Sequence, residues 1–281
     1  MTFEVPCMVL CTIMFAYHDV TGNYIQTIDK SEPIAISKDN WHKLMYRFEW
    51  FACDGKYRNF TLQQNENKFI VIETIIDAVT FDSTKRQYII DMPAYGSWIK
   101  SNIKVCVCDG VIAGIVTLVD YCECRYAIRN IRHEGGELSF SKWEFDTASA
   151  PIWGFYVAYD NARKCMHRFY QLHDCGPIID IDGYFSDINS CHADIYSIIV
   201  YNGVVSVFDM HGYDSFDVGG ICVGKAEYIH INDVIVYGHL VVGVVYDGEY
   251  KLEARDMRTG DIYEIVSNEA LYHVSAIIHI V

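Results

Sequence analysis

The sequence predicts an all-β protein of the β-propeller type, and three observations carry this prediction. Its apolar runs are short and rich in β-branched and aromatic residues, with no sustained helical period. Asp-Gly and similar pairs separate these runs, as in tight hairpins. Finally, aspartates that close a strand recur at an average of about 39 residues, a period typical of propeller blades. These aspartates are Asp54, Asp82, Asp120, Asp160, Asp209 and Asp247.

The clearest repeat covers residues 233–266 and reads as one four-stranded antiparallel sheet. Its expected strands are 234–237, 240–246, 250–257 and 261–266. Gly238-His239, Asp247-Gly248 and Arg258-Thr259-Gly260 are the expected turns between them, where glycine accepts the positive φ of a tight turn. Four short strands cannot bury both faces alone, so this repeat requires neighbours of the same kind.

The rest of the chain supplies such neighbours. The strands expected there are 8–17, 23–28, 33–37, 44–53, 57–62, 69–81, 86–92, 103–108, 111–119, 125–131, 137–145, 153–159, 164–172, 199–201 and 204–208. Asp54-Gly55, Asp109-Gly110 and Asn202-Gly203 are expected to form turns between them. The third clear repeat starts at Ile195, and its Ile199 to Gly203 aligns with residues 235–239.

We therefore predict one domain, residues 1–281, with seven four-stranded blades, or six as the alternative. The first repeat lacks an opening strand, so residues 271–281 are expected to supply it and close the ring in the N-terminal blade. Such closure leaves few open sheet edges. With only 5 Pro and no Gly/Ser-rich run, the sequence shows no linker and no domain boundary.

The chain resembles the WD40-like and quinoprotein-like propellers at the level of architecture. The resemblance rests on the Asp-x-x-Thr-Gly turn from Asp256 to Gly260 and on the spacing of the repeats. No Trp-Asp dipeptide occurs, and the double glycines at Gly135 and Gly219 are not followed by kelch aromatics in register. The resemblance thus implies a propeller without assigning one family.

Composition limits the partners and the compartment. A formal net charge of −15 opposes binding to nucleic acid, which requires clustered Lys and Arg. Eleven Cys, without a convincing signal peptide, indicate reduced thiols and a cytoplasmic location. The apolar run 5–17 lacks a basic flank and is interpreted as a buried strand, and nothing reaches the ~18 residues of a membrane span. We expect no membrane association.

His173, Cys175, Cys191 and His192 form the best candidate metal site, because a loop could bring two Cys and two His together. Their separation is longer than in common zinc motifs. A second set, Cys106, Cys108, Cys122 and Cys124, contains two Cys-x-Cys pairs. An intervening strand of about ten residues at ~3.3 Å each separates those pairs, so buried thiols are the preferred interpretation.

Two charged motifs have both a functional and a structural interpretation. Asp180-x-Asp182-Gly183 resembles a calcium loop, but Ile178 occupies the place of the first ligand, which favours an acidic turn. The second motif is the one dense basic patch, made by Arg125, Arg129, Arg132 and His133. It either binds a carboxylate or phosphate of a partner or balances neighbouring acid on a solvated face.

No catalytic residue is assigned. The sequence contains neither a Gly-x-Ser-x-Gly elbow nor a phosphate-binding glycine loop, and the order of residues selects no triad. We expect a non-enzymatic propeller scaffold without a cofactor that binds a protein partner through loops on one rim. The alternatives are an assembly component of a large complex or virus particle, and an enzyme with its site in the central channel.

Overall fold

The structure is a computed structural model. It describes residues 11–19, 22–27, 34–45, 49–65, 68–93, 98, 100–160, 162–173, 176–189, 195, 197–209, 212–227, 231–237, 240–246, 250–256, 261–268 and 272–280. The chain divides into two compact units. The first comprises residues 1–59, 74–85 and 228–281, and the second comprises residues 60–73 and 86–227.

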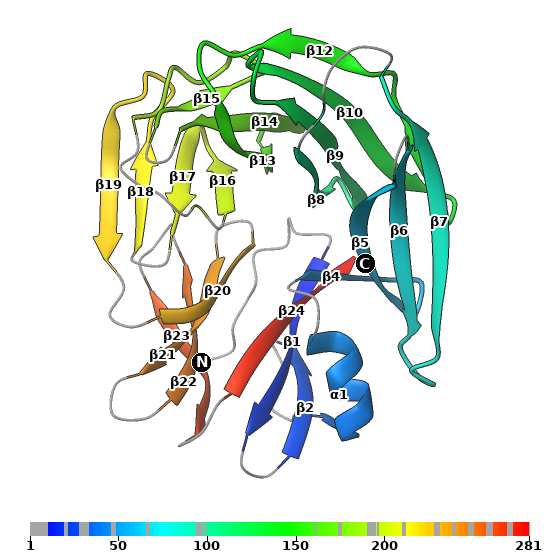
Figure 1. Cartoon of the computed structure of the whole chain (residues 1–281). Coiled ribbons are helices and arrows are strands. Elements are labelled where there is room, and N and C mark those ends of the chain that lie inside the picture. Colours follow the sequence, from blue (N-terminus) through cyan, green and yellow to red (C-terminus); the bar gives the residue numbers. More distant parts are fainter. Residues whose placement is uncertain are drawn as a thin grey trace. The chain divides into compact units, whose positions relative to one another are not determined.

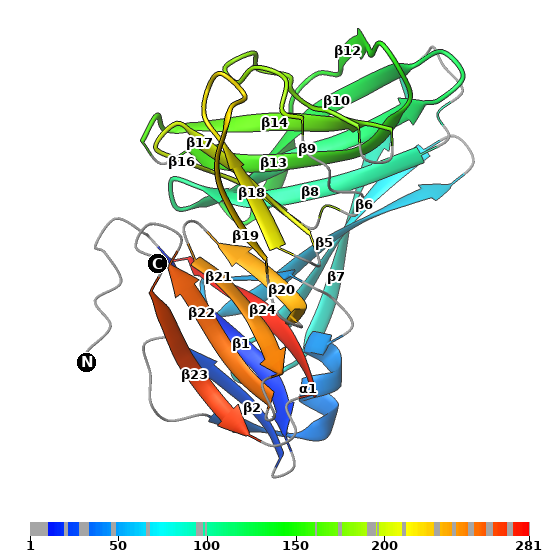
Figure 2. The same ribbon diagram turned by 90° about the vertical axis from the view of Figure 1, so that its left-hand side faces the viewer.

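The described strands form five sheets (Figure 1). The largest has eight strands, in the spatial order β3 (Ile34–Ile36), β2 (Gly22–Thr27), β1 (Cys11–Asp19), β24 (Tyr272–Ile280), β4 (Glu49–Cys53), β5 (Lys56–Asn65), β6 (Lys68–Asp77) and β7 (Ser83–Asp91). The first compact unit holds a four-stranded sheet, clearly visible in Figure 2: β20 (Ile231–Tyr237), β21 (Leu240–Tyr246), β22 (Tyr250–Asp256) and β23 (Ile262–Asn268). This is the repeat that the sequence predicts most clearly, with the expected strand order.

The second compact unit holds the other three sheets. The β8–β12 sheet contains β8 (Lys100–Cys108), β9 (Val111–Asp120), β10 (Arg125–Glu134), β11 (Glu137–Phe140) and β12 (Glu144–Thr147). The β13–β15 sheet contains β13 (Ile152–Asp160), β14 (Cys165–Leu172) and β15 (Ile178–Asp180). The β16–β19 sheet contains β16 (Ser197–Tyr201), β17 (Val204–Phe208), β18 (Gly212–Phe216) and β19 (Cys222–Glu227).

These three sheets pack on one another as propeller-like blades. The first strand of each, β8, β13 and β16, lies beside the first strand of the next. Two buried clusters fill the spaces between neighbouring sheets. One joins β9 and β10 to β13 and β14 through Ile115, Val119, Tyr126, Ile128, Ile152, Phe155, Tyr170 and Leu172. The other joins the β13–β15 sheet to the β16–β19 sheet and includes Phe169, Ile178, Ile198, Val205, Val207 and Phe216. The predicted all-β, propeller-like architecture is confirmed, whereas the number of blades and the closure of a ring stay predictions.

The C-terminal strand pairs with the N-terminal one, as the sequence predicts. Strand β24 is antiparallel to β1, with Phe15 opposite Ala276. On its other side β24 is parallel to β4, with Ile277 opposite Trp50, a pairing that the sequence does not announce. The parallel pairing joins two groups of strands into the eight-stranded sheet.

Three predicted hairpin turns have the conformation that their sequences favour. Both residues of Asp54-Gly55, Asp109-Gly110 and Asn202-Gly203 have φ between +50° and +79°. Two successive positive φ angles are characteristic of the type I′ turn, whose twist matches that of the flanking strands. Asp and Asn tolerate the first position and Gly the second. The predicted turns at 238–239, 247–248 and 258–260 lie outside the described residues.

Three of the recurrent aspartates have a common structural role. The buried carboxylates of Asp120, Asp160 and Asp209 each accept a hydrogen bond from the backbone of the following turn, at 3.0, 2.9 and 2.9 Å. Each carboxylate therefore satisfies backbone N–H groups that the strand has left unpaired. Asp82 does not take this part in its turn. There Asp77 accepts the N–H groups of residues 79 and 80, both at 2.9 Å.

The expected strand 44–53 is wrong in its first part. Helix α1 (Lys38–Met45) occupies residues 44 and 45, and β4 begins at Glu49. Ser37 Oγ accepts the N–H of Asn40 at 3.2 Å and caps the helix. At the other end, Trp50 Nε1 donates to the carbonyl of Leu44 at 2.7 Å, which satisfies a terminal carbonyl. No helix among the described residues is long and apolar enough to cross a bilayer.

The expected strand 137–145 is also wrong, because it is two strands. β11 and β12 both pair with β10 along the same edge, and residues 141–143 separate them. At the break, Ser141 Oγ accepts the N–H of Asn130 at 2.9 Å, and the Ser141 carbonyl accepts a hydrogen bond from Arg129 Nε. These side-chain hydrogen bonds add to a backbone bond from the Ser141 N–H to the Asn130 carbonyl, and apolar periodicity cannot reveal them.

Candidate functional site

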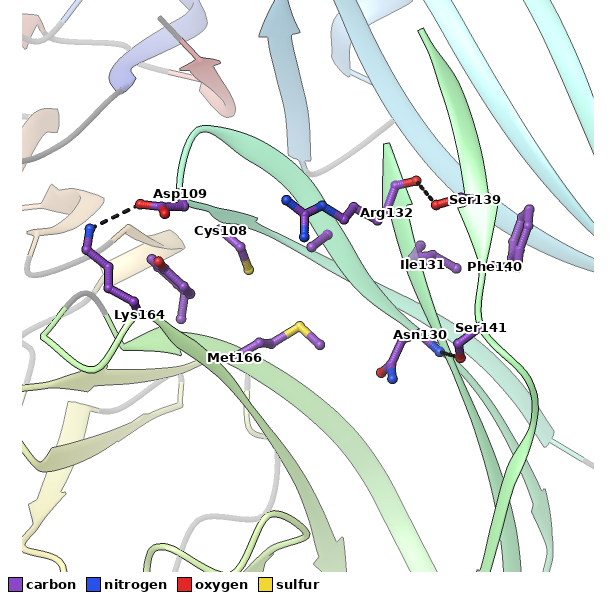
Figure 3. A pocket seen from close by; sticks show the side chains of 12 residues that line it. Cys108, Asp109, Asn130, Ile131, Arg132, Ser139, Phe140, Ser141, Lys164 and Met166 are labelled. Atoms are coloured by element: carbon purple, nitrogen blue, oxygen red, sulfur yellow. Dashed lines mark hydrogen bonds and ion pairs between the residues drawn. The ribbon is translucent and has the colours of Figure 1, made fainter. Parts of the chain in front are cut away.

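A cleft of about 550 Å³ opens between the β8–β12 sheet and the ends of β13 and β14 (Figure 3). Strands β8 to β11 contribute one wall, and the turn between β13 and β14 contributes the other. Its lining residues are Cys108, Asp109, Ala113, Asn130, Ile131, Arg132, Ser139, Phe140, Ser141, Tyr159, Lys164 and Met166. The lining mixes cations, hydroxyl groups and apolar side chains, so it offers both hydrogen bonds and a packing surface.

Hydrogen bonds and an ion pair hold the walls of this cleft. Lys164 Nζ lies 3.1 Å from Asp109 Oδ1 and links the β13–β14 turn to the β8–β9 turn. Ser139 Oγ donates to the carbonyl of Arg132 at 3.1 Å, across β10 and β11. In Figure 3, Met166 extends from β14 into the space between these walls. Protein groups therefore already pair with part of the polar lining, while the thioether can adapt to a ligand.

Tyr159 adds a hydrogen-bond donor to the cleft. Burial first, and then the negative charge of Asp109, raise the pKa of Tyr159 to about 12. Its phenol therefore stays protonated throughout the physiological range. Arg132, Lys164 and Tyr159 add to the donors that Asn130, Ser139 and Ser141 provide, whereas Asp109 is the one carboxylate among the described lining residues.

The basic patch that the sequence indicates does not exist as one surface. Arg125 and Arg129 share a face of β10, but Arg132 lies on the opposite face, because side chains alternate along a strand. Arg125 NH1 lies 2.8 Å from Glu123 Oε2. Arg129 Cζ lies 5.3 Å from the centre of the Phe140 ring and 5.8 Å from the centre of the Trp143 ring. Of the three arginines, Arg132 alone lines the cleft.

His133, the fourth member of that patch, is buried. Its Nε2 lies 3.3 Å from Oε1 of Glu73, a carboxylate with no exposed surface. Tyr88 OH donates to the other oxygen of Glu73 at 2.8 Å. These three side chains connect β6, β7 and β10 inside the second compact unit, so His133 stabilises packing and takes no part in a charged surface.

A Cys-His-Asp arrangement lies on β14 and β15, and the sequence analysis missed it. Cys165 Sγ is 3.5 Å from His167 Nε2, and His167 Nδ1 is 3.4 Å from Asp180 Oδ2. The imidazole is 3% exposed and packs against Phe169 and Phe185. Cys165-x-His167 is a signal for a shared strand face, but only the pairing of β14 with β15 brings Asp180 alongside.

Asp180 is primarily a structural carboxylate. It accepts backbone N–H groups of Asp182, Tyr184 and Phe185 at 3.1, 3.0 and 3.0 Å. Burial raises its pKa, but hydrogen bonds from His167 and from the backbone outweigh burial and leave the pKa below its usual value. The carboxylate therefore remains charged at neutral pH and holds both the loop and the imidazole.

The second carboxylate of the predicted acidic turn is also held by protein groups. Arg168 NH2 donates to Asp182 Oδ1 at 2.8 Å, and the Arg168 backbone N–H donates to Asp182 Oδ2 at 2.9 Å. Burial lowers the pKa of Arg168, but Asp182 and Glu144 outweigh burial and raise it. Because protein donors already bind both Asp180 and Asp182, the loop has the interactions of an acidic turn.

We expect the Cys165 thiol to react slowly. Burial first, and then the charge of Asp160, raise its pKa, which lowers the thiolate fraction at pH 7. Iodoacetamide should modify Cys165 more slowly than it modifies free cysteine, and the rate should still rise above pH 9. Mass spectrometry of the Cys165 peptide at pH 7, 8, 9 and 10 measures this profile. Faster modification than free cysteine at pH 7 would contradict it and indicate an activated nucleophile.

The predicted metal site lies mostly outside the described residues. His173 follows β14, and its N–H donates to the carbonyl of Pro151 at 3.0 Å. The positions of Cys175, Cys191 and His192 are not described, so the site stays a prediction. Within the described ranges, no group of three or more His, Cys, Asp or Glu side chains could hold a metal ion.

The four cysteines of the second set fall into two separate places. Cys106 and Cys108 share a face of β8, with their sulfur atoms 3.4 Å apart. Cys122 and Cys124 lie in the turn that follows β9. In the β8–β9 register, Cys108 is opposite Val111 and residue 100 is opposite residue 119, so the two pairs lie at opposite ends of the hairpin. The expected separation is confirmed, but the interpretation as buried thiols is wrong, because Cys122 is exposed and the other three are only partly buried.

No protein-family model matches this sequence, and no curated protein matches it either. Several solved structures are similar in fold. Apo AztD from Citrobacter koseri shares 9% identity with a TM-score of 0.46, over 95% of this chain and 98% of that one. The dihydro-heme d1 dehydrogenase NirN in complex with DHE shares 8% identity with a TM-score of 0.39, over 93% of this chain and 74% of that one. The WD40 domain of SCAP from fission yeast shares 7% identity with a TM-score of 0.35, over 94% of this chain and 71% of that one. At these identities and TM-scores, the likeness says nothing about ligand, activity or partner.

Proposed function

We propose that this chain is a non-enzymatic propeller-type scaffold that binds a partner protein through the cleft of Figure 3. The observation that carries the proposal is the composition of the cleft: an arginine, a tyrosine and a methionine lie among polar groups. Arg, Met and aromatic residues are the types enriched at protein interfaces.

Arg132 is the centre of the proposed binding surface. Its side chain is 57% exposed, and its Nε lies 2.5 Å from Glu134 Oε1. The planar guanidinium has five N–H donors, so it can bind a partner carboxylate or main-chain carbonyls in addition to Glu134. Met166 supplies apolar surface in the same cleft, and Tyr159 supplies an aromatic ring. Such a combination matches the arginine and apolar anchors that dominate protein binding energies.

The cleft is a poor match for acid–base catalysis. Among the described lining residues, Asp109 is the one carboxylate and is paired with Lys164, and none is a histidine. Tyr159 stays protonated and therefore acts as a donor and not as a base. The cysteine in the Cys-His-Asp arrangement has a raised pKa and does not line the cleft. These features favour binding over turnover.

Replacing Arg132 with alanine should weaken binding of the partner about tenfold or more, because a central arginine commonly contributes this much to an interface. The partner is first identified by mass spectrometry of proteins that co-purify with the tagged full chain. Its dissociation constant is then measured by titration calorimetry with the wild type and with Arg132→Ala.

Arg125→Ala is a matched control for this measurement. Arg125 lies on the same strand, is 51% exposed and pairs with a neighbouring glutamate, but it faces the other side of β10. It should bind as the wild type does. Equal losses in both variants would indicate a non-specific charge effect, and no loss in either would place the partner elsewhere. A chain that assembles with itself in sedimentation and retains no partner would favour the assembly role instead.

A further inference from the structure

A second, smaller cleft of about 290 Å³ lies between β8 and β13 in the second compact unit. Its lining residues are Lys100, Asn102, Lys104, Trp153, Gly154, Phe155, Tyr156 and Ile195. The three residues from β8 occupy alternate positions, so their side chains share one face of the strand. Opposite them, Trp153 is 46% exposed and Tyr156 is buried. The cleft therefore has a polar wall and an aromatic wall.

Among the described residues, this cleft is lined by two lysines and by no carboxylate, although the chain as a whole carries a net charge of −15. Lys100 Nζ donates to the Trp153 carbonyl at 2.7 Å and lies 5.8 Å from the centre of the Trp153 ring. Lys104 Nζ lies 5.6 Å from the centre of the Tyr156 ring. Within the described part of the chain, neither ammonium group forms an ion pair.

Aromatic contacts hold both ammonium groups at the cleft. A ring face attracts a cation, but it does not neutralise the charge as a carboxylate would. Asn102 Oδ1 accepts the N–H of Ile103 at 2.8 Å, which leaves the side-chain amide nitrogen as a donor between the two lysines. The face of β8 thus presents donors at three alternate positions and no anionic acceptor.

We propose that this cleft binds an extended acidic segment of a partner protein, separately from the cleft of Figure 3 and irrespective of whether that cleft binds a protein. We expect the segment to contain two acidic residues four positions apart, whose carboxylates pair with Lys100 and Lys104. A polar side chain between them accepts a hydrogen bond from Asn102, and an apolar part of the segment packs on Trp153.

The spacing of the lysines favours an extended peptide over a single compact anion. Four residues along a strand span about 13 Å at ~3.3 Å each. An extended ligand has the same rise and the same alternation, so acidic residues at positions i and i+4 come opposite the two lysines, and position i+2 comes opposite Asn102. A single phosphate would have to draw both lysine side chains away from their aromatic rings.

The test uses the full chain and a fluorescein-labelled peptide, Gly-Glu-Ala-Ser-Ala-Glu-Gly, with binding followed by fluorescence anisotropy at low salt. A peptide with both Glu replaced by Gln and one with the two Glu adjacent serve as ligand controls. We expect the spaced acidic peptide to bind on the order of tenfold more tightly than either control, as two partly exposed ion pairs allow. The binding should weaken as salt is added.

The variant Lys100→Gln/Lys104→Gln should bind the spaced peptide on the order of tenfold more weakly and lose the preference over the neutral peptide. Lys142→Gln changes an exposed lysine outside the cleft and should leave the preference unchanged. Trp153→Ala should weaken the binding of all three peptides.

Three results would overturn the proposal. These are equal affinity for the spaced and the adjacent acidic peptides, an equal loss in Lys142→Gln, and displacement of the peptide by tripolyphosphate at or below the peptide's own dissociation constant. The last result would assign the cleft to compact polyanions. None of these outcomes depends on the co-purified partner or on Arg132.

Discussion

Asp180→Ala should lower the free energy of unfolding by about 3–5 kcal/mol, the loss typical when one partner of a buried charged pair is removed. The carboxylate accepts three backbone N–H groups of its own loop and lies 3.4 Å from His167 Nδ1. Alanine leaves these donors buried without an acceptor. Urea unfolding of the full chain, followed by circular dichroism at pH 7, measures the change.

Asp217→Ala is a matched control, because Asp217 Oδ1 accepts one exposed backbone N–H, from Ile221, at 2.9 Å. Asp217→Ala should lower the free energy of unfolding by about 1 kcal/mol. The pH dependence gives a second check. The pKa of Asp180 is lowered in the folded state, so its contribution is fully present above about pH 4, the unfolded value, and is lost as the pH falls through the folded value. A difference between wild type and Asp180→Ala that persists unchanged at pH 2 would contradict the role of the charge.

Gly114→Ala should destabilise the chain by about 3 kcal/mol or more and lower its soluble yield. A Cβ atom at this position would lie 2.0 Å from the carbonyl oxygen of Lys104 and 2.9 Å from Cα of Val105. Both atoms belong to the backbone of β8, where Val105 is opposite Gly114. Because neither can move as a flexible side chain would, β8 and β9 would have to separate. Urea unfolding and the soluble fraction after expression test this result.

Gly224→Ala provides the comparison, since it also adds a methyl group to a strand glycine. Its nearest neighbour would be Ser215 Cβ at 3.6 Å, an ordinary van der Waals distance. This variant should stay within about 0.5 kcal/mol of the wild type. Equal stability of the two variants would show that β8 and β9 do not approach as closely as the structure indicates.

Most of the strands could be predicted because their signals are local. Asp109-Gly110 and Asn202-Gly203 encode two successive positive φ angles, and short β-branched runs flank them. The register of a hairpin follows once the turn is fixed. Strand β21 (Leu240–Tyr246) accordingly has the predicted bounds. Helix α1 was not predicted, because eight residues are too few to show a helical period. In addition, the hydrogen bond that satisfies its Leu44 carbonyl comes from Trp50, a residue outside the helix.

The sites could be predicted far less well. The sequence indicates one basic patch from Arg125 to His133, but the structure separates its members. Arg125 pairs with Glu123 on the surface, and Arg129 stacks on Phe140. Arg132 lines the cleft, and His133 is buried against Glu73. Part of this separation follows from strand alternation. The rest depends on which sheet packs against each face, and that is a tertiary property.

By itself, the sequence determined the all-β class and the hairpin turns, because backbone conformation and periodicity encode them over a few residues. It also indicated the pairing of the C-terminal strand with β1, because the first repeat lacks an opening strand. Only the tertiary structure decided that His167 lies between Cys165 and Asp180, that Arg132 lines a cleft while Arg125 does not, and that Lys100 and Lys104 lie over the rings of Trp153 and Tyr156. Such contacts join strands that are neighbours in space but separated in sequence, and no local preference specifies which side chains meet between packed sheets.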